Sequence, residues 1–317
     1  MTTDDLRPDP PTVGLSTTDL LTTDVRTTAR LTAEGWTAHD ITKALASGVL
    51  VRVKRGIYAP AGAMSVRDAH VRLARAVAEE SAKSVISHVS AAVLHGLPVR
   101  NTALDRVHVT RPDTGHGKTT AHQRLHLRPL DAGDVVVRDG VRVTSLERTI
   151  VDLARTEPFG WAVSAADAAL RLGLKRPVLQ AAAGRLRHVP GGTKAVGVVA
   201  FADARAESPL ESWSRVSIAR AGFPAPELQW EVRDTDGEWC ATTDFGWPGH
   251  GMVGEADGKG KYEEQLASGR SGADLVMSAQ RRDEAIRQSG WRVCHWGWAV
   301  ATDHRLLGAL LRPYLTG

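Results

Sequence analysis

The hydrophobic pattern near the start of the chain predicts two short helices. Residues 26–35 contain helix-forming residues and stop at a glycine, and a second helix begins after Thr37, whose hydroxyl suits an N-cap. Three apolar residues of the second helix recur at helical spacing and share one face: Ile41, Ala44 and Leu45. Two short helices joined by a tight turn predict a helix-turn-helix.

The run at residues 49–60 alternates apolar and basic side chains and therefore predicts a strand pair. Its valines are expected on one side of the strand: Val49, Val51 and Val53. Arg52 and Lys54 are expected on the other side, and Arg55 opens the turn between the strands. Basic residues at the tip of such a hairpin are typical of a wing that touches the phosphate backbone of DNA.

Residues 63–190 have the pattern of a mixed α+β block. Helices are expected at 66–82, 87–96 and 145–155, and strands at 105–112 and in a hairpin that turns at Asp139-Gly140. The histidines of this block show no ligand spacing on any one element. We therefore expect them at the surface or in helix caps: His70, His88, His95, His108, His116, His122 and His126.

The last part of the chain predicts a helix followed by three strands. The helix begins at Ser208 with a proline at its first position, and the strands are expected at 228–233, 239–247 and 251–262. Four residues of the third strand share parity and would line one face if the strand continues past Gly258: Glu255, Asp257, Lys259 and Lys261. Asp244, late in the preceding strand, is expected opposite that face.

This grouping of acidic residues indicates a metal site. Carboxylates gathered beside an ammonium group are unfavourable unless a divalent cation neutralises them, and oxygen ligands without His or Cys suit Mg²⁺ or Mn²⁺. A metal held by Asp244 and Glu255 would polarise a phosphodiester and acidify a bound water. A lysine nearby would orient that water or stabilise the developing charge. The pattern therefore predicts cleavage of phosphodiester bonds.

Charge is distributed unevenly along the chain. Residues 26–155 hold 20 basic and 12 acidic side chains, a net charge of +8, whereas residues 201–317 hold 13 and 17, a net charge of −4. A basic block beside an acidic one is consistent with a part that binds a polyanion and a part that concentrates carboxylates.

Composition excludes several other classes of protein. No apolar stretch approaches the ~18 residues of a membrane span, and the first residues lack the order of a signal peptide. Cys240 and Cys294 are the only cysteines and form neither a CxxC pair nor a Cys/His cluster, so we expect no disulfide framework and no structural zinc site. The expected location is the cytoplasm.

The N-terminal segment resembles a known family. Residues 26–60, and above all the stretch LTAEGWTAHDITKALASGVLVRVKRGIY, resemble the winged-helix domain of the AbiEi antitoxins of type IV toxin–antitoxin systems. Shorter stretches at 87–99 and 143–155 are similar to actinobacterial members of that family. The resemblance implies DNA binding and autoregulation. It makes four basic residues the expected phosphate contacts: Lys43, Arg52, Lys54 and Arg55.

Residues 207–300 resemble the PD-(D/E)XK nuclease superfamily, and within it the Vsr-like endonucleases of very-short-patch repair. The resemblance is carried by Glu211 in ESPLES, Asp244 in TTDFGWP, and Glu255 with Asp257 in VGEADGKGKY. An Arg-rich helix and a closing strand follow in AQRRDEAIRQSGWRVCHWGW. The whole chain is similar to actinobacterial proteins that join both modules. By resemblance, Glu211 supports the site.

The motif departs from the superfamily at one position. In the central E-x-K the lysine follows the acid by two residues, but here Asp257 stands in that place. Asp257-Gly258-Lys259 can be taken as the D-x-K, or Lys261 stands where relatives of this branch have a histidine, in an E-x-D-G-x-x-H pattern. We take Glu255 and Asp257 as the acids, with Lys261 ahead of Lys259 as their basic partner.

We therefore expect an α+β protein. The main hypothesis for its function is that it is a DNA-binding, Mg²⁺-dependent endonuclease of phage defence or repair. The alternative is a non-enzymatic repressor or antitoxin with a degenerate nuclease fold and a cognate toxin protein as partner. The expected parts are a disordered leader (1–22), a winged-helix-like domain (23–62), a mixed α+β middle (63–190), a connecting helix (191–206) and an α/β/α endonuclease-like domain with a central mixed sheet (207–317).

Overall fold

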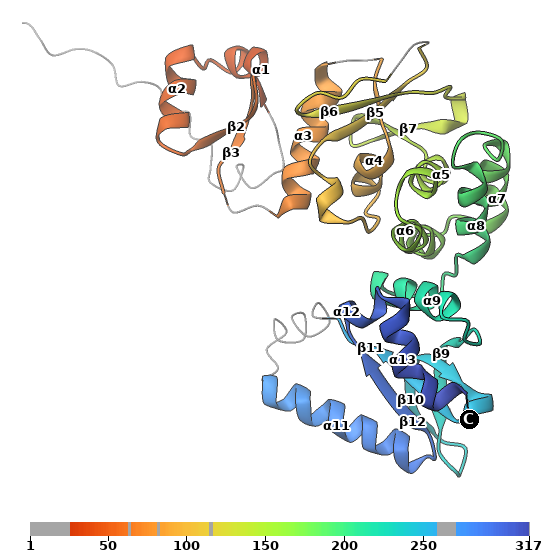
Figure 1. Cartoon of the computed structure of the whole chain (residues 1–317). Coiled ribbons are helices and arrows are strands. Elements are labelled where there is room, and N and C mark those ends of the chain that lie inside the picture. The colour runs from red at the N-terminus through yellow and green to blue at the C-terminus, as the bar shows by residue number, and fades with distance from the viewer. Residues whose placement is uncertain (1–25, 63–64, 81–82, 114–116, 259–270, 317) are drawn as a thin grey trace, which may run out of the picture.

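The chain folds as an α+β protein with three sheets, as the sequence predicts (Figure 1). The computed structural model describes residues 26–62, 65–80, 83–113, 117–258 and 271–316. No helix within these ranges is long and apolar enough to cross a membrane.

The N-terminal unit has two helices and a small antiparallel sheet. Its elements are β1 (Arg26–Thr27), α1 (Thr28–Ala33), α2 (Ala38–Ala46), β2 (Leu50–Lys54) and β3 (Ile57–Pro60), with strand order β1-β3-β2. A capping box between Thr37 and Asp40 starts α2, as expected from the sequence. Ile41 and Ala44 are buried against β2 and β3. Val49 is 50% exposed because β2 begins only after it, so its predicted place beside Val51 and Val53 is wrong.

The middle unit combines a five-stranded mixed sheet with a group of helices. Its elements are α3 (Val66–Glu80), β4 (Val85–Ile86), α4 (His88–Leu94), η2 (Asn101–Ala103), β5 (Val107–Arg111), β6 (Gln123–Leu127), η3 (Ala132–Asp134), β7 (Val135–Arg138), β8 (Val141–Thr144), α5 (Leu146–Thr156), α6 (Phe159–Arg171), α7 (Arg176–Arg185) and α8 (Gly192–Phe201). The strand order is β6-β5-β4-β8-β7. Asp139 and Gly140 both have positive φ in the β7–β8 hairpin, which confirms the turn predicted there.

Helix α8 belongs to the core of this middle unit. Ala195 and Val198 are fully buried in the same cluster as Ile150 of α5 and Ala165 of α6. The segment predicted as a connecting helix therefore packs as part of the middle unit, and the chain leaves that unit after residue 201.

The C-terminal unit has three layers. Its elements are α9 (Pro209–Arg220), β9 (Glu227–Arg233), β10 (Trp239–Trp247), η4 (Pro248–His250), β11 (Met252–Ala256), α11 (Gly272–Gln288), β12 (Arg292–Trp296), α12 (Trp298–Ala301) and α13 (His304–Leu315). The strand order is β12-β11-β10-β9, and only the β11–β12 pair is parallel among the pairs described. Phe245, Met252 and Trp296 bury one face of the sheet under α9 and α13. Helix α11 covers the other face, where Ile286 packs on Val253.

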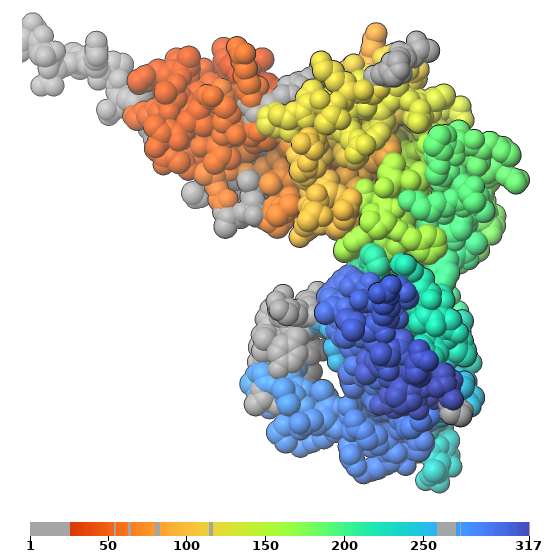
Figure 2. All heavy atoms as spheres, viewed as in Figure 1, coloured from red at the N-terminus to blue at the C-terminus, as the bar shows by residue number. Residues whose placement is uncertain are grey.

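Helix α9 joins the C-terminal unit to the middle unit (Figures 1 and 2). Ser208 caps this helix and Pro209 occupies its first turn, as predicted. On α6, Asp167 accepts hydrogen bonds from the side chains of Ser212 (2.8 Å) and Arg215 (2.9 Å) on α9. These buried polar contacts hold the two units in one arrangement.

Candidate active site in the C-terminal sheet

Asp244 and Glu255 lie side by side on adjacent strands. Strands β10 and β11 are antiparallel with Phe245 opposite Gly254, so the register places Asp244 opposite Glu255 on the same face. The backbone N–H of Ala256 donates to Oδ2 of Asp244 at 2.8 Å. The two residues are only 5% and 6% exposed. The structure thus brings together the two acids that the sequence singled out.

Alternation along the strands explains why this pair faces α11. Phe245, Gly254 and Cys294 pair across β10, β11 and β12 and belong to the face under α9 and α13. Their neighbours in sequence, Asp244 and Glu255, therefore point to the face that α11 covers. Apolar residues on the same face, such as Val253, fill the layer between the sheet and α11.

Burial and mutual repulsion make the ionised form of Glu255 unfavourable. Loss of solvent, followed by the nearby Asp244 carboxylate, raises the pKa of Glu255 to about 7, although Arg282 acts in the opposite direction. Oε1 of Glu255 is buried, and a charged group of opposite sign is therefore needed beside it. A buried pair of carboxylates is an arrangement that could hold a cation.

The cation that Glu255 meets in the structure is Arg282 of α11. One guanidinium nitrogen lies 2.6 Å from Oε1 of Glu255, and the same nitrogen donates to the carbonyl oxygen of Thr242 on β10. The side chain of Arg282 is 40% exposed. It therefore closes the site from the solvent side and is long enough to turn away from it.

His295 adds a second positive group next to Glu255. It lies on β12 opposite Glu255 in the parallel register. Its Nδ1 is 2.9 Å from Asp257, and its Nε2 is 3.0 Å from Asp283 of α11. The hydrogen bond that the ring donates to Asp257 is the main cause that raises the pKa of His295 to about 9, with the charges of both aspartates adding to it. His295 is therefore an imidazolium ion at neutral pH.

Asp257 does not share the strand geometry of Glu255. Strand β11 ends at Ala256, so the predicted strand over 251–262 is too long. The N–H of Asp257 donates to the carbonyl of Trp296 (2.9 Å), and its carboxylate, 65% exposed, is paired with His295. The predicted set of three metal-binding acids is thus reduced to a pair. Lys259 and Lys261 lie outside the described residues.

Glu211 is buried at the start of α9, on the opposite side of the sheet from α11. It accepts hydrogen bonds from the N–H of Glu207 (2.7 Å), the hydroxyl of Ser208 (2.8 Å) and the amide of Gln229 (3.3 Å). These contacts stabilise the first turn of the helix and its position on β9. The supporting role that the resemblance implies for Glu211 stays a prediction.

The basic residues of the N-terminal unit form a separate surface. Lys43 is exposed on α2. Lys54 is the last residue of β2, and Arg55 is exposed in the turn that follows it. Arg52 is exposed on β2, with its guanidinium 5.9 Å from the ring centroid of Tyr58. The arrangement of two helices and a basic hairpin is the one predicted, and Figure 1 shows this unit at one end of the fold.

Two site residues, His295 and Arg282, were not among the catalytic residues expected from the sequence. The alternation of the closing strand carries a signal for the first: Cys294 and Trp296 are buried on one face, which leaves His295 for the other. Arg282 is one of several charged residues in α11, and only the packing of that helix on β10 distinguishes it from Arg281.

Comparison with known proteins gives relatives of unstated activity. Two proteins of Mycobacterium tuberculosis, both described as uncharacterized, are similar to the chain: MT2308 of strain CDC 1551 and Rv2248 of strain H37Rv. Each is 29% identical over 251 residues, which is 78% of this chain and 85% of the relative. No protein-family model matches the chain.

Proposed function

We propose that the protein binds DNA and that its C-terminal unit cleaves phosphodiester bonds with a divalent cation held by Asp244 and Glu255. The observation that supports this proposal is the buried pair of carboxylates on adjacent strands, in which Glu255 has a raised pKa of about 7. Oxygen donors without a soft ligand fit Mg²⁺ or Mn²⁺. The resemblance to the PD-(D/E)XK superfamily points to the same chemistry.

Each residue around the pair has a definite task in this proposal. When bound, the cation would supply Lewis-acid polarisation of the phosphate. Arg282 leaves Glu255 and contacts a phosphate oxygen, because its exposed side chain can turn outward. His295 presents a positive imidazolium beside the same face, and Asp257 and Asp283 fix the orientation of its ring. Positive groups placed in advance stabilise the charge that grows on the phosphate.

DNA binding is assigned to the N-terminal unit. Its exposed basic residues lie on α2 and on the hairpin, where the winged-helix resemblance expects phosphate contacts. A location in the cytoplasm, beside chromosomal or phage DNA, is part of this proposal.

One observation favours a second function, that of a non-enzymatic repressor or antitoxin that pairs with a toxin protein. A guanidinium nitrogen of Arg282 already lies 2.6 Å from Oε1 of Glu255, and the ring of His295 is already hydrogen-bonded to Asp257 and Asp283. If these contacts are permanent, the carboxylates serve packing and no cation enters. DNA binding through the hairpin would then remain without cleavage.

Nicking of supercoiled DNA separates the two functions. The full chain is incubated with plasmid and Mg²⁺ or chelator, alongside Asp244→Asn, Glu255→Gln and the matched control Glu231→Gln, an exposed acid on β9. We expect Mg²⁺-dependent nicking that the first two substitutions abolish and the control retains. Absence of nicking by the wild-type chain at any Mg²⁺ or Mn²⁺ concentration, together with intact DNA binding, would establish the repressor.

A further inference from the structure

Three histidines of the middle unit converge beside α4, far from the acids in sequence. His88 is the first residue of α4, and His108 and His126 lie on the adjacent parallel strands β5 and β6. The register pairs Thr110 with His126, so His108 and His126 point to the same face. His88 and His108 are only 4% and 8% exposed, so the expected surface or cap positions are wrong for them.

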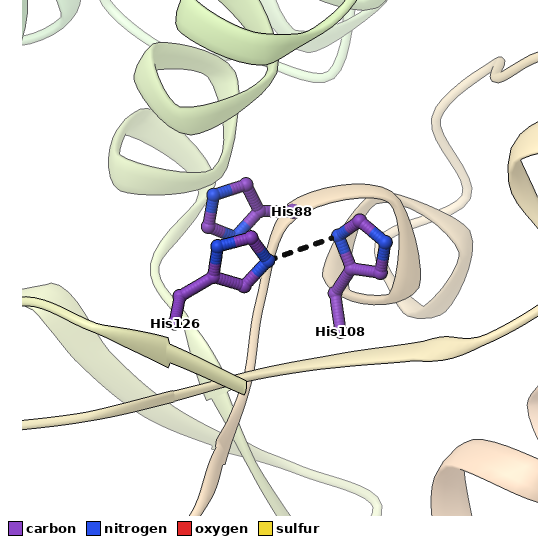
Figure 3. Close-up of side chains that lie close together, drawn as sticks. All are labelled: His88, His108 and His126. Carbon is purple, nitrogen blue, oxygen red and sulfur yellow. Dashed lines mark hydrogen bonds between the residues drawn. The ribbon is translucent and has the colours of Figure 1, made fainter. Parts of the chain in front are cut away.

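The ring nitrogens lie within reach of one ion. Each ring offers one nitrogen, and these three nitrogens all lie within 4.8 Å of one another. Nε2 of His126 is 3.2 Å from Nδ1 of His108. Two nitrogens bound to one tetrahedral Zn²⁺ lie about 3.3 Å apart, a similar distance. Figure 3 shows His88 stacked over His126, with a centroid separation of 3.7 Å.

Burial favours the neutral form of all three imidazoles, because it lowers the pKa of each. Burial, followed by the neighbouring histidines, holds the pKa of His88 well below its ordinary value. Burial is also the main cause that lowers the pKa of His108 to about 3 and that of His126 to about 4. Neutral imidazole is the form that binds transition metals.

The backbone holds His88 in an unusual conformation. Its φ is +52°, in the left-handed region that few residues other than glycine adopt, although Asn, Asp and His do so more often than the rest. The hydroxyl of Ser87 lies 3.0 Å from Nδ1 of His88, and Thr110 donates to that hydroxyl at 2.8 Å. Ser90 accepts from the backbone N–H of His108 at 2.8 Å. A hydrogen-bond partner on one ring nitrogen fixes the orientation of the ring and leaves the other nitrogen for a metal.

Buried aspartates compensate two of the arginines near the histidine cluster. Arg148 is paired with Asp134 at 2.7 Å and with Asp152 at 3.1 Å. Arg155 is 3.6 Å from Asp152. These two positive and two negative groups offset one another, whereas Arg124 and Arg128 add positive charge beside His126.

We propose that His88, His108 and His126 form a transition-metal site whose ion is Zn²⁺. Three neutral nitrogen donors match the number of protein ligands in open zinc sites, in which water or another small ligand takes the fourth position. Mg²⁺ is excluded as the ion here because it prefers oxygen ligands. This site is independent of the carboxylate pair in the C-terminal sheet and of the proposed nuclease.

Competition with a chromophoric chelator for Zn²⁺ tests the site on the full, tag-free chain. The variants are His108→Gln, His126→Gln and His88→Asn, the last because Asn tolerates positive φ. We expect the wild-type chain to bind one Zn²⁺. Each variant should bind Zn²⁺ about 100-fold more weakly or worse, which is at least as large as the loss seen when a residue that only supports a metal ligand is removed. The control His122→Gln alters an exposed histidine just before β6 and should bind like the wild type.

A second readout separates this site from the acids near His295. Co²⁺ bound by the wild-type chain should give visible absorption bands of a tetrahedral site, and His295→Gln should retain both these bands and Zn²⁺ binding. The proposal is overturned if the wild-type chain does not bind Zn²⁺. It is also overturned if His295→Gln abolishes Zn²⁺ binding while His126→Gln retains it. Circular dichroism in chelator confirms that each variant folds before its affinity is compared.

Discussion

Replacement of Glu255 by glutamine should change how stability depends on pH. In the folded state, burial and Asp244 raise the pKa of Glu255 from an ordinary 4.5 to about 7. An acid whose pKa is raised by folding contributes stability that is fully present below its unfolded pKa and is lost as the pH rises through its folded pKa. Glutamine resembles the protonated acid and carries no such loss.

The magnitude follows from the two pKa values. A rise from 4.5 to about 7 corresponds to about 3 kcal/mol at a pH above both. We therefore expect wild type and Glu255→Gln to have similar free energies of unfolding near pH 4, and the variant to be about 3 kcal/mol more stable near pH 8. The side chain of Glu255 is only 7% exposed, so solvent screening reduces this difference little.

Urea unfolding in chelator, followed by tryptophan fluorescence, measures the difference. Seven of the nine tryptophans fall between residues 213 and 298, so this signal reports mainly on the C-terminal unit. Glu231→Gln serves as control because its side chain is 58% exposed. A stability difference between Glu255→Gln and wild type that stays constant from pH 4 to pH 8 would refute the reasoning about this carboxylate.

Three further predictions concern the other units. Arg52→Ala and Arg55→Ala should each weaken DNA binding and lower the slope of log affinity against log salt by about 1, as fluorescence anisotropy would show; an unchanged slope contradicts the wing assignment. Arg148→Ala should cost about 3 kcal/mol in thermal unfolding because it removes the closest cation from two buried aspartates, which keep only the longer contacts to Arg185 and Arg155, whereas the exposed Arg205→Ala should cost little. Gly160→Ala should destabilise the contact of α6 with α9 by about 1–3 kcal/mol, since the new methyl group meets an indole ring; equal urea midpoints would exclude this clash.

Local signals in the sequence were sufficient for much of the fold. Thr37 and Ser208 cap the helices predicted to begin there, and the turn at Asp139-Gly140 forms as expected. Such signals act within a few residues, so they survive whatever packs around them. The opposition of Asp244 and Glu255 was likewise predictable, because strand alternation and one antiparallel pairing determine it.

Other features depend on contacts between distant segments and were not predictable. The end of β11 at Ala256 is one, since the alternation in the sequence continues through Asp257 although the strand ends before it. The three histidines are another, because each lies on a different element, and the packing of α4 against β5 together with the pairing of β5 and β6 brings them together. A search for ligand spacing along a single element misses such a group.

The most direct test of the central claim is anomalous diffraction from crystals of the full chain soaked in Mn²⁺. The account predicts an anomalous peak between the carboxylates of Asp244 and Glu255, with metal–oxygen distances of about 2.1 Å, as expected for a hard octahedral ion. The peak should be lost in Asp244→Asn. Arg282 should then have moved away from its present position 2.6 Å from Glu255. No peak between the two carboxylates, with the Arg282 contact intact, would contradict the claim.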